Sequence, residues 1–129
     1  MNPDQQPQLE GTKLSGFEPV QSVQQLEILD TVPGTGEEVQ PGATVTAHYT
    51  GALCADGTIF QSSHDRGEPV TFPLDHVIQG WQQGVPGMKV GGTRRLIIPA
   101  AMAYGAQSPA PNIPANSDLV FDIELVAIS

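Results

Sequence analysis

Short stretches of the chain alternate between apolar and polar residues, which is the pattern of β-strands that bury one face. Residues 119–128 show it most clearly, because every second residue from Leu119 to Ala127 is apolar. Residues 44–51 repeat the pattern, with Tyr49 on the face that is expected to be buried. Strands are predicted over residues 23–32, 44–51, 58–61, 70–72, 93–99 and 119–128.

One stretch between these strands has helical spacing instead. Ile78, Trp81 and Val85 are spaced i, i+3 and i+7, which places them on one side of a short helix. Asp75 is expected to cap its start, and the Pro-Gly pair at 86–87 is expected to end it. Two glycines inside this helix each cost about 1 kcal/mol relative to alanine. The helix therefore has to lie against the predicted sheet.

An α+β fold follows from this pattern, because a short helix on the concave face of a twisted antiparallel sheet buries both apolar surfaces. Residues 1–21 are polar, contain three prolines and have few large apolar residues. They are predicted to form a flexible polar tail, with only local docking of Leu14 and Phe17. Residues 22–129 are predicted to form the single domain, with residues 104–118 as a proline-rich loop.

Composition narrows the choice of partners. Five basic and fourteen acidic residues give a formal net charge of −9, which disfavours nucleic acid and anionic membrane surfaces as partners. A single cysteine, Cys54, excludes an intramolecular disulfide and is expected to be a half-buried, unreactive residue. The chain has no apolar run of about 18 residues and no signal-peptide pattern at its start. A cytoplasmic protein is the resulting expectation.

The chain carries none of the common motifs of nucleophilic or metal-dependent catalysis. Its histidines, His48, His64 and His76, are scattered without ligand spacing, so neither a metal nor another cofactor is expected. Asp65 and Arg66 are adjacent and could form an ion pair with a structural role.

Aromatic residues at the ends of the predicted elements are more distinctive. They are Tyr49, Phe60, Phe72, Trp81, Tyr104 and Phe121. From periodicity alone, they fit a hydrophobic core at least as well as a binding site.

At these residues the sequence closely resembles the FKBP-type (macrolide-binding) peptidyl-prolyl cis/trans isomerases, in the small single-domain form common in bacteria. The resemblance extends from about Val23 to Ile128. It rests on residues 48–51, 56–60, 62–63, 66–67, 77–81, 84–85, 88, 91–92, 95–96, 98–99, 103–105, 113–116 and 119–125.

The resemblance implies a five- to six-stranded antiparallel half-barrel wrapped around one short α-helix, with a pocket between helix and sheet and the indole as its floor. It implies that the catalytic residues are Tyr49, Phe60, Trp81, Tyr104 and Phe121. The implied substrate-binding residues are Val77, Ile78, Ile113, Gln61, Arg66 and Val70. The Ile78 N–H and the Tyr104 hydroxyl would donate hydrogen bonds to ligand carbonyls.

The resemblance further implies rotation about X-Pro bonds in unfolded or flexible protein segments, which assists folding, and binding of macrolides such as rapamycin by a monomer. Two alternatives are a proline-peptide-binding module without turnover and a folding helper. Gln61 stands where the family usually has aspartate, Val70 where an aromatic residue is common, and Pro109 also departs from the pattern. These departures bear on macrolide affinity more than on isomerisation.

Overall fold

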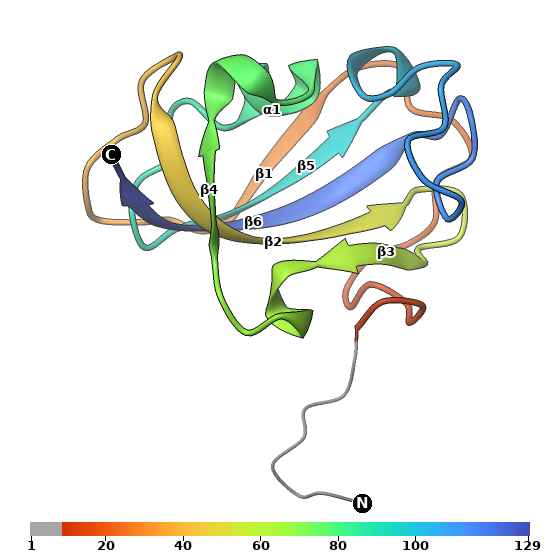
Figure 1. Cartoon of the computed structure of the whole chain (residues 1–129), viewed down its shortest axis with the longest axis horizontal. Helices are drawn as coiled ribbons and strands as arrows, with labels where there is room; N and C mark the ends of the chain where they lie inside the picture. The colour runs from red at the N-terminus through yellow and green to blue at the C-terminus, as the bar shows by residue number, and fades with distance from the viewer. Residues whose placement is uncertain (1–8) are drawn as a thin grey trace, which may run out of the picture.

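Residues 9–129 form six strands, one α-helix and three short 3-10 helices (Figure 1). The computed structural model describes residues 9–129. The strands are β1 (Glu27–Val32), β2 (Thr44–Leu53), β3 (Ile59–Ser62), β4 (Val70–Pro73), β5 (Thr93–Ile98) and β6 (Leu119–Ile128). The helix is α1 (Gln79–Gly84), and three single-turn 3-10 helices are η1 (Ser63–Asp65), η2 (Leu74–His76) and η3 (Ala100–Met102).

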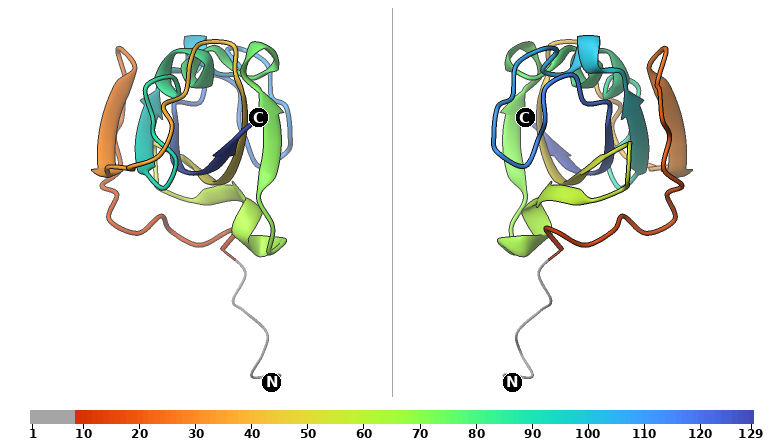
Figure 2. Two further views of the ribbon diagram at one scale, coloured as in Figure 1. Left: turned by 90° about the vertical axis from the view of Figure 1, so that its left-hand side faces the viewer. Right: turned by 90° about the vertical axis from the view of Figure 1, so that its right-hand side faces the viewer.

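The strands form one antiparallel sheet in the order β1-β5-β6-β2-β3, and β4 pairs with the first half of β2. The sheet curls so that β1 and β4 stand on opposite sides of the molecule, with α1 above the space between them (Figure 2). The predicted α+β half-barrel is therefore confirmed. The first strand begins at Glu27 rather than at Val23, because the N–H of Val23 donates to the carboxylate of Asp118 at 3.0 Å instead of joining the ladder.

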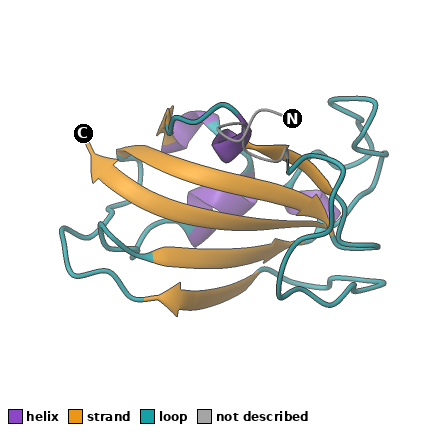
Figure 3. Cartoon of the chain, turned by 90° about the horizontal axis from the view of Figure 1, so that it is seen from below, coloured by secondary structure: helices purple, strands orange, loops and turns teal. Residues whose placement is uncertain are grey.

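The helix α1 lies against one face of the sheet, which is called the inner face below (Figure 3). Its two glycines face β5 closely: a Cβ atom on Gly80 would lie 2.6 Å from Ile98, and one on Gly84 would lie 2.7 Å from Leu96. The helix therefore approaches the strand so closely that only glycine fits at these two positions, although glycine is a poor helix former. No helix among residues 9–129 is long and apolar enough to cross a membrane.

The start of α1 differs from the prediction. Asp75 is not its cap: it lies one turn earlier, in η2, and the helix begins after Ile78 without a hydrogen bond from a capping side chain. The extended backbone of Val77 (φ −110°, ψ 173°) separates the two turns and moves the helix start beyond the reach of Asp75. The side-chain amide of Gln82 donates to the carbonyl of Val77 at 2.8 Å and holds this start in place.

The predicted flexible tail, residues 1–21, also differs in the part that the structure describes. Residues 9–21 run along β3 and beneath the sheet towards β1 (Figure 2). The N–H of Gly11 donates to the carbonyl of Ile59, and the N–H of Ile59 donates to the carbonyl of Thr12, each at 2.8 Å. Residues 9–21 are thus an ordered part of the fold, because an edge strand offered them hydrogen-bond partners. Residues 1–8 lie outside the described residues.

This segment seals an outer cluster of aliphatic side chains on the other face of the sheet. Strand alternation places Val120 on the face opposite Leu119 and Phe121, which was expected to be mostly exposed to water. Val120 is nevertheless fully buried, because Leu14 and Val23 cover it. The cluster consists of Leu14, Val23, Ala52, Cys54, Ile59, Ile97 and Val120.

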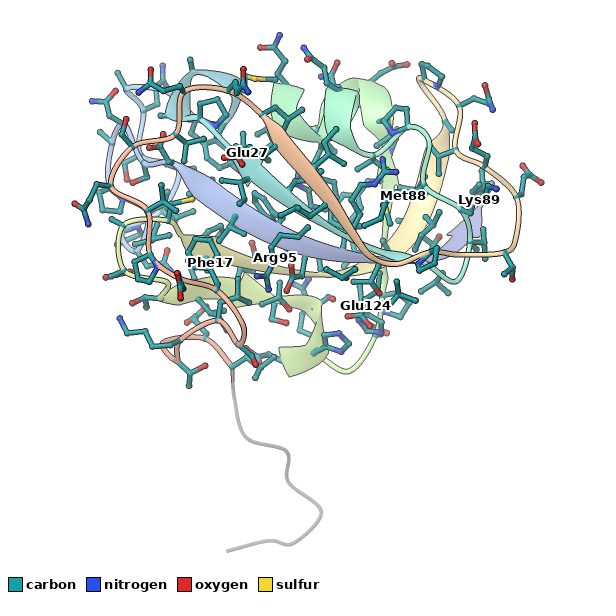
Figure 4. The ribbon with its side chains drawn as sticks, turned by 180° about the vertical axis from the view of Figure 1, so that it is seen from behind. Phe17, Glu27, Met88, Lys89, Arg95 and Glu124 are labelled. Carbon is teal, nitrogen blue, oxygen red and sulfur yellow. The ribbon has the colours of Figure 1, made fainter. Side chains whose placement is uncertain are left out.

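Arg95 of β5 fastens the segment to the outer face. Its guanidinium donates to the carbonyls of Ser15 and Gly16 at 3.1 and 2.8 Å, and to the carboxylate of Asp122 at 2.7 and 2.9 Å. It also lies 5.7 Å from the ring centre of Phe17 (Figure 4). The hydrogen bonds that Arg95 donates to Asp122 raise the pKa of Arg95 further, so its charge is permanent.

Cys54 is completely buried within the outer cluster, rather than half-buried as predicted, because residues of the N-terminal segment cover that face of the sheet. Burial is the main cause that raises the pKa of its thiol to about 12, with smaller contributions from the charges of Asp118 and Glu27. The thiol is therefore protonated at neutral pH and unreactive, as predicted.

Candidate functional site

A cavity of about 340 Å³ opens between α1 and the inner face of the sheet. Its walls come from β2, β3, β4, β6, α1 and the loop after β5, so segments far apart in sequence meet there. The lining residues are Tyr49, Phe60, Gln61, Phe72, His76, Val77, Ile78, Trp81, Tyr104 and Phe121.

Trp81 forms the floor of the cavity. It is 4% exposed, and three rings meet it edge-to-face: Phe72, Phe121 and Tyr49, with ring centres 5.0, 5.4 and 5.7 Å away. Such arrangements are preferred by aromatic quadrupoles and hold the indole in one orientation. The indole Nε1 is buried and has no hydrogen-bond partner among the described residues. Because Nε1 is buried, a ligand in the cavity meets the apolar part of the indole and not its N–H group.

Gly51 of β2 allows two walls of the cavity to meet. A Cβ atom at this position would lie 2.6 Å from Cζ of Phe60 and 2.7 Å from Cε1 of Phe121. With hydrogen in its place, the two rings pack edge-to-face at 5.7 Å and 87°. Glycine within a strand often marks such a close approach, and here it sets the shape of the site.

Polar groups are few around the cavity. Tyr104 is 39% exposed, and its pKa is raised, first by burial and then by the neighbouring Tyr49, so its hydroxyl stays protonated and can donate. Among the described residues no hydrogen bond uses the N–H of Ile78 at the start of α1. Gln61 brings an amide to the rim, and the lining contains no carboxylate. The site can therefore hold an apolar ring and bind its carbonyls, but it offers no nucleophile paired with a base.

Comparison with known protein families matches residues 35–126 to the family described as FKBP-type peptidyl-prolyl cis-trans isomerase. The chain belongs to this FKBP family. The predicted family, fold and enzyme class are thereby confirmed.

Individual FKBP relatives agree. The chain is 50% identical over 93 residues to the peptidyl-prolyl cis-trans isomerase FPR2 of Saccharomyces cerevisiae, covering 70% of this chain and 69% of that one. It is 45% identical over 102 residues to a probable FK506-binding protein of Corynebacterium glutamicum, covering 79% and 86%. A crystal structure of a peptidyl-prolyl cis-trans isomerase from Pseudomonas syringae pv. tomato superimposes with a TM-score of 0.73 at 38% identity, covering 81% and 75%.

The cavity gathers eight of the eleven site residues that the sequence suggested. These are Tyr49, Phe60, Gln61, Val77, Ile78, Trp81, Tyr104 and Phe121. Their individual roles in an FKBP reaction stay predictions.

The other three suggested residues lie outside the cavity wall. Val70, at the start of β4, packs against the inner core. Ile113 is buried in the same core, and its N–H donates to the carbonyl of Ala110. Arg66 is exposed at the end of η1. Its neighbour Asp65 makes no ion pair with it in the described structure; instead the Asp65 carboxylate accepts the N–H groups of Leu9 and Glu10 at 2.7 and 3.0 Å.

Two lining residues, Phe72 and His76, are not among the site residues that the family resemblance implied, although Phe72 belongs to the distinctive aromatic residues. Phe72 shares a face of β4 with Val70 and lies two residues further on, where its ring reaches Trp81. Strand alternation could have identified it as the aromatic wall at this place. His76 reaches the rim because η2 turns there, and no sequence signal indicated that turn.

The histidines are also less scattered than the sequence suggested. His48 and His64 stack with ring centres 4.1 Å apart and planes 9° apart. His48 bonds Ser63, and His64 bonds Glu124 on the neighbouring strand. In the described residues no group of three or more potential ligands is arranged to hold a metal ion.

Proposed function

We propose that this chain catalyses cis/trans rotation about X-Pro bonds, with the proline ring seated on Trp81 in the aromatic cavity. The observation that carries the proposal is the apolar floor of an open 340 Å³ cavity in a chain of the FKBP family. The floor is fixed on three sides by aromatic rings and offers area without a polar partner.

The chemistry needs no group that transfers a proton. Rotation about a peptide bond has a barrier of about 18–20 kcal/mol, because amide resonance is lost in the twisted state. That twisted state carries less negative charge on its carbonyl oxygen than the planar amide does. An apolar cavity therefore disfavours the planar ground state more than the twisted state, and this difference lowers the barrier.

The polar groups at the rim would orient the substrate rather than react with it. We assign the Tyr104 hydroxyl, kept protonated by its raised pKa, as a donor to a substrate carbonyl. We assign the Ile78 N–H as a second donor, since it lines the cavity at the start of α1. Two donors at fixed points would hold the substrate peptide on either side of its proline while the bond between them rotates.

A non-catalytic proline-binding module is the second candidate. Gln61 favours it, because an amide replaces the carboxylate that the family usually presents beside the phenylalanine. A folding helper that works through its surface is a third candidate, and substitutions in the cavity distinguish it from the other two.

Macrolide binding is part of the proposal as a general property of the cavity. It is supported by the relative from Corynebacterium glutamicum, whose name describes a probable FK506-binding protein. Proline-containing segments of unfolded proteins as partners and a monomeric state are proposed with it, both carried over from the family. A cytoplasmic location is also part of the proposal.

A protease-coupled isomerisation assay on a proline tetrapeptide tests the function. Wild type is expected to accelerate isomerisation, and Phe60→Ala, which opens one wall of the cavity, to lose most of the kcat/KM. Tyr104→Phe removes only the hydroxyl and one substrate hydrogen bond, so it is expected to lower kcat/KM by up to about tenfold. Phe17→Ala is the matched control, because Phe17 packs against the outer cluster.

The isomerisation assay and a refolding assay together distinguish the two other candidate functions. A wild-type chain that binds the peptide without accelerating isomerisation is a proline-binding module. A chain whose effect on refolding of a proline-limited protein survives Phe60→Ala acts through its surface.

A further inference from the structure

Three successive inward-facing residues of β5 contact α1 along its length. Ile98 faces Gly80 and Leu96 faces Gly84, so closely that neither glycine could carry a side chain without displacement. The third residue, Arg94, lies beyond the end of the helix. This strand thus supports α1 along its length, and Trp81 lies between the two glycines.

Arg94 bonds the end of the helix directly. Its Nη1 donates to the carbonyls of Gly84 and Pro86 at 2.8 and 3.2 Å. The last carbonyls of a helix have no partner within it, and they carry the negative end of the helix dipole. The guanidinium of Arg94 is buried, with 10% of the side chain exposed. It therefore supplies both a hydrogen-bond donor for these carbonyls and a positive charge at the negative end of α1.

Asp30 on β1 holds the guanidinium in this position. Its two carboxylate oxygens accept hydrogen bonds from Nε and Nη2 of Arg94 at 2.6 and 3.1 Å, which leaves Nη1 directed at the helix. The hydrogen bonds from Arg94 are the largest cause that lowers the pKa of Asp30, opposed in part by burial. The fork is planar and bidentate, so it sets the orientation of the side chain as well as its charge.

We propose that Arg94, oriented by Asp30, is a positioning residue that holds α1 and thereby sets the depth and orientation of Trp81 in the cavity. This rests on the proposed isomerase function. The helix has only six residues and no side-chain cap at its start, so its own hydrogen bonds hold it weakly. Displacement of its last turn would tilt the indole away from the proline ring, and small misplacements in a preorganised site reduce rates strongly.

Arg95 provides a matched control on the same strand. It also donates to one carboxylate and to two backbone carbonyls, and 13% of its side chain is exposed against 10% for Arg94. Its contacts, however, are with residues 15 and 16 on the outer face and not with the helix. The two arginines thus make equivalent bonds, and only one of them bonds to α1.

The experiment compares Arg94→Met, Arg94→Lys, Asp30→Asn and Arg95→Met in the full chain, at a temperature where each variant is folded. Three quantities are measured: kcat/KM on a proline tetrapeptide, the near-ultraviolet circular dichroism of the only tryptophan, and the melting temperature. Arg94→Met is expected to lower kcat/KM by about tenfold and to reduce the tryptophan signal. Arg94→Lys should recover part of both, and Asp30→Asn should show a smaller loss of both.

Arg95→Met should lower the melting temperature while kcat/KM stays within about twofold of wild type and the tryptophan signal is unchanged. The proposal is overturned if Arg94→Met lowers only the melting temperature, or if both arginine variants change kcat/KM equally. If Arg94→Met does not fold, Asp30→Asn decides the question, because the Asp30 side chain is 52% exposed and its loss is milder. If wild type shows no isomerase activity, the proposed function fails, while the tryptophan signal still reports whether Arg94 positions Trp81.

Discussion

The inner face of the sheet carries aromatic rings around an open cavity, whereas the outer face carries aliphatic side chains sealed beneath residues 9–21. Both faces belong to the same strands, and adjacent residues of β6 and β5 serve opposite faces. On the inner side, packing leaves a cavity and fixes the rings that line it. On the outer side, packing closes completely around Val120 and Cys54. Substitutions on the inner face should therefore change both activity and stability, whereas substitutions on the outer face should change stability alone.

The largest effect is expected from Phe121→Ala, compared with Val120→Ala on the opposite face of the same strand. Phe121→Ala should lower the free energy of unfolding by about 3–5 kcal/mol and remove most of the isomerase activity, because the ring supports Trp81. Val120→Ala should lower it by about 1.5–3 kcal/mol and leave kcat/KM of the folded protein unchanged.

Urea unfolding and the isomerisation assay give both quantities for this pair. Phe121→Leu replaces Phe121→Ala if the alanine variant is unfolded. An equal loss of kcat/KM in the two variants would show that the faces are not functionally separate.

Leu14→Ala tests the seal on the outer face. Leu14 is 8% exposed within the outer cluster, so the variant should lose about 2 kcal/mol of stability through lost burial and a residual void. Thermal unfolding measures the loss, and kcat/KM at low temperature should match wild type. Leu29→Ala on β1 is the control, because Leu29 is 49% exposed and its removal should change stability by less than about 0.5 kcal/mol. Equal stability of Leu14→Ala and wild type would contradict a packed segment.

Gly51→Ala tests the inner face by crowding it. The added methyl group must displace Phe60 and Phe121, which should cost about 1–3 kcal/mol and lower kcat/KM. Gly91→Ala is the control: Gly91 has φ +90° and open space around its Cβ position, so the variant strains the backbone away from the cavity. We expect Gly51→Ala and Gly91→Ala to lose comparable stability, and only Gly51→Ala to lose kcat/KM. Wild-type kcat/KM in Gly51→Ala would mean that the Phe60–Phe121 contact does not shape the site.

The smallest effect concerns the buried thiol of Cys54 at alkaline pH. In the folded chain its pKa is about 12, whereas in the unfolded chain the thiol ionises near its ordinary value. Between these values the folded state binds one more proton than the unfolded state, so stability falls as pH rises. From pH 8 to pH 10, wild type should lose about 1–2 kcal/mol more than Cys54→Ala, which has no thiol to ionise. Parallel stability curves for the two proteins would show that Cys54 is not desolvated.

Alternation along the strands was sufficient to predict the inner face, because Val45, Tyr49 and Ile123 each lie between polar residues and all three are buried in the inner core. It could not predict burial of Val120, since that depends on residues 9–21, whose polar residues and Pro19 are typical of a free tail. Their order comes from contacts with β3 and with Arg95, which are distant in sequence.

The residues of the candidate site could be predicted where the residue type matched the family motif and strand alternation placed the side chain on the inner face. Local geometry decided the rest. Asp75 was expected to cap α1, but η2 intervenes, and the same turn brings His76 to the cavity rim. The stacking of His48 on His64 depends on how η1 folds back over β2, which no spacing in the sequence reveals.

The position of β6 in the sheet bears on when the chain can fold. It lies between β5 and β2, so it alone joins the pair β1-β5 to the group formed by β2, β3 and β4. It is also the last of the six strands to leave the ribosome. Until it appears, both halves expose their apolar faces and neither the cavity nor the outer seal exists. Assembly of this domain therefore waits until its last strand has been synthesised, and long-range pairing of this kind is slow.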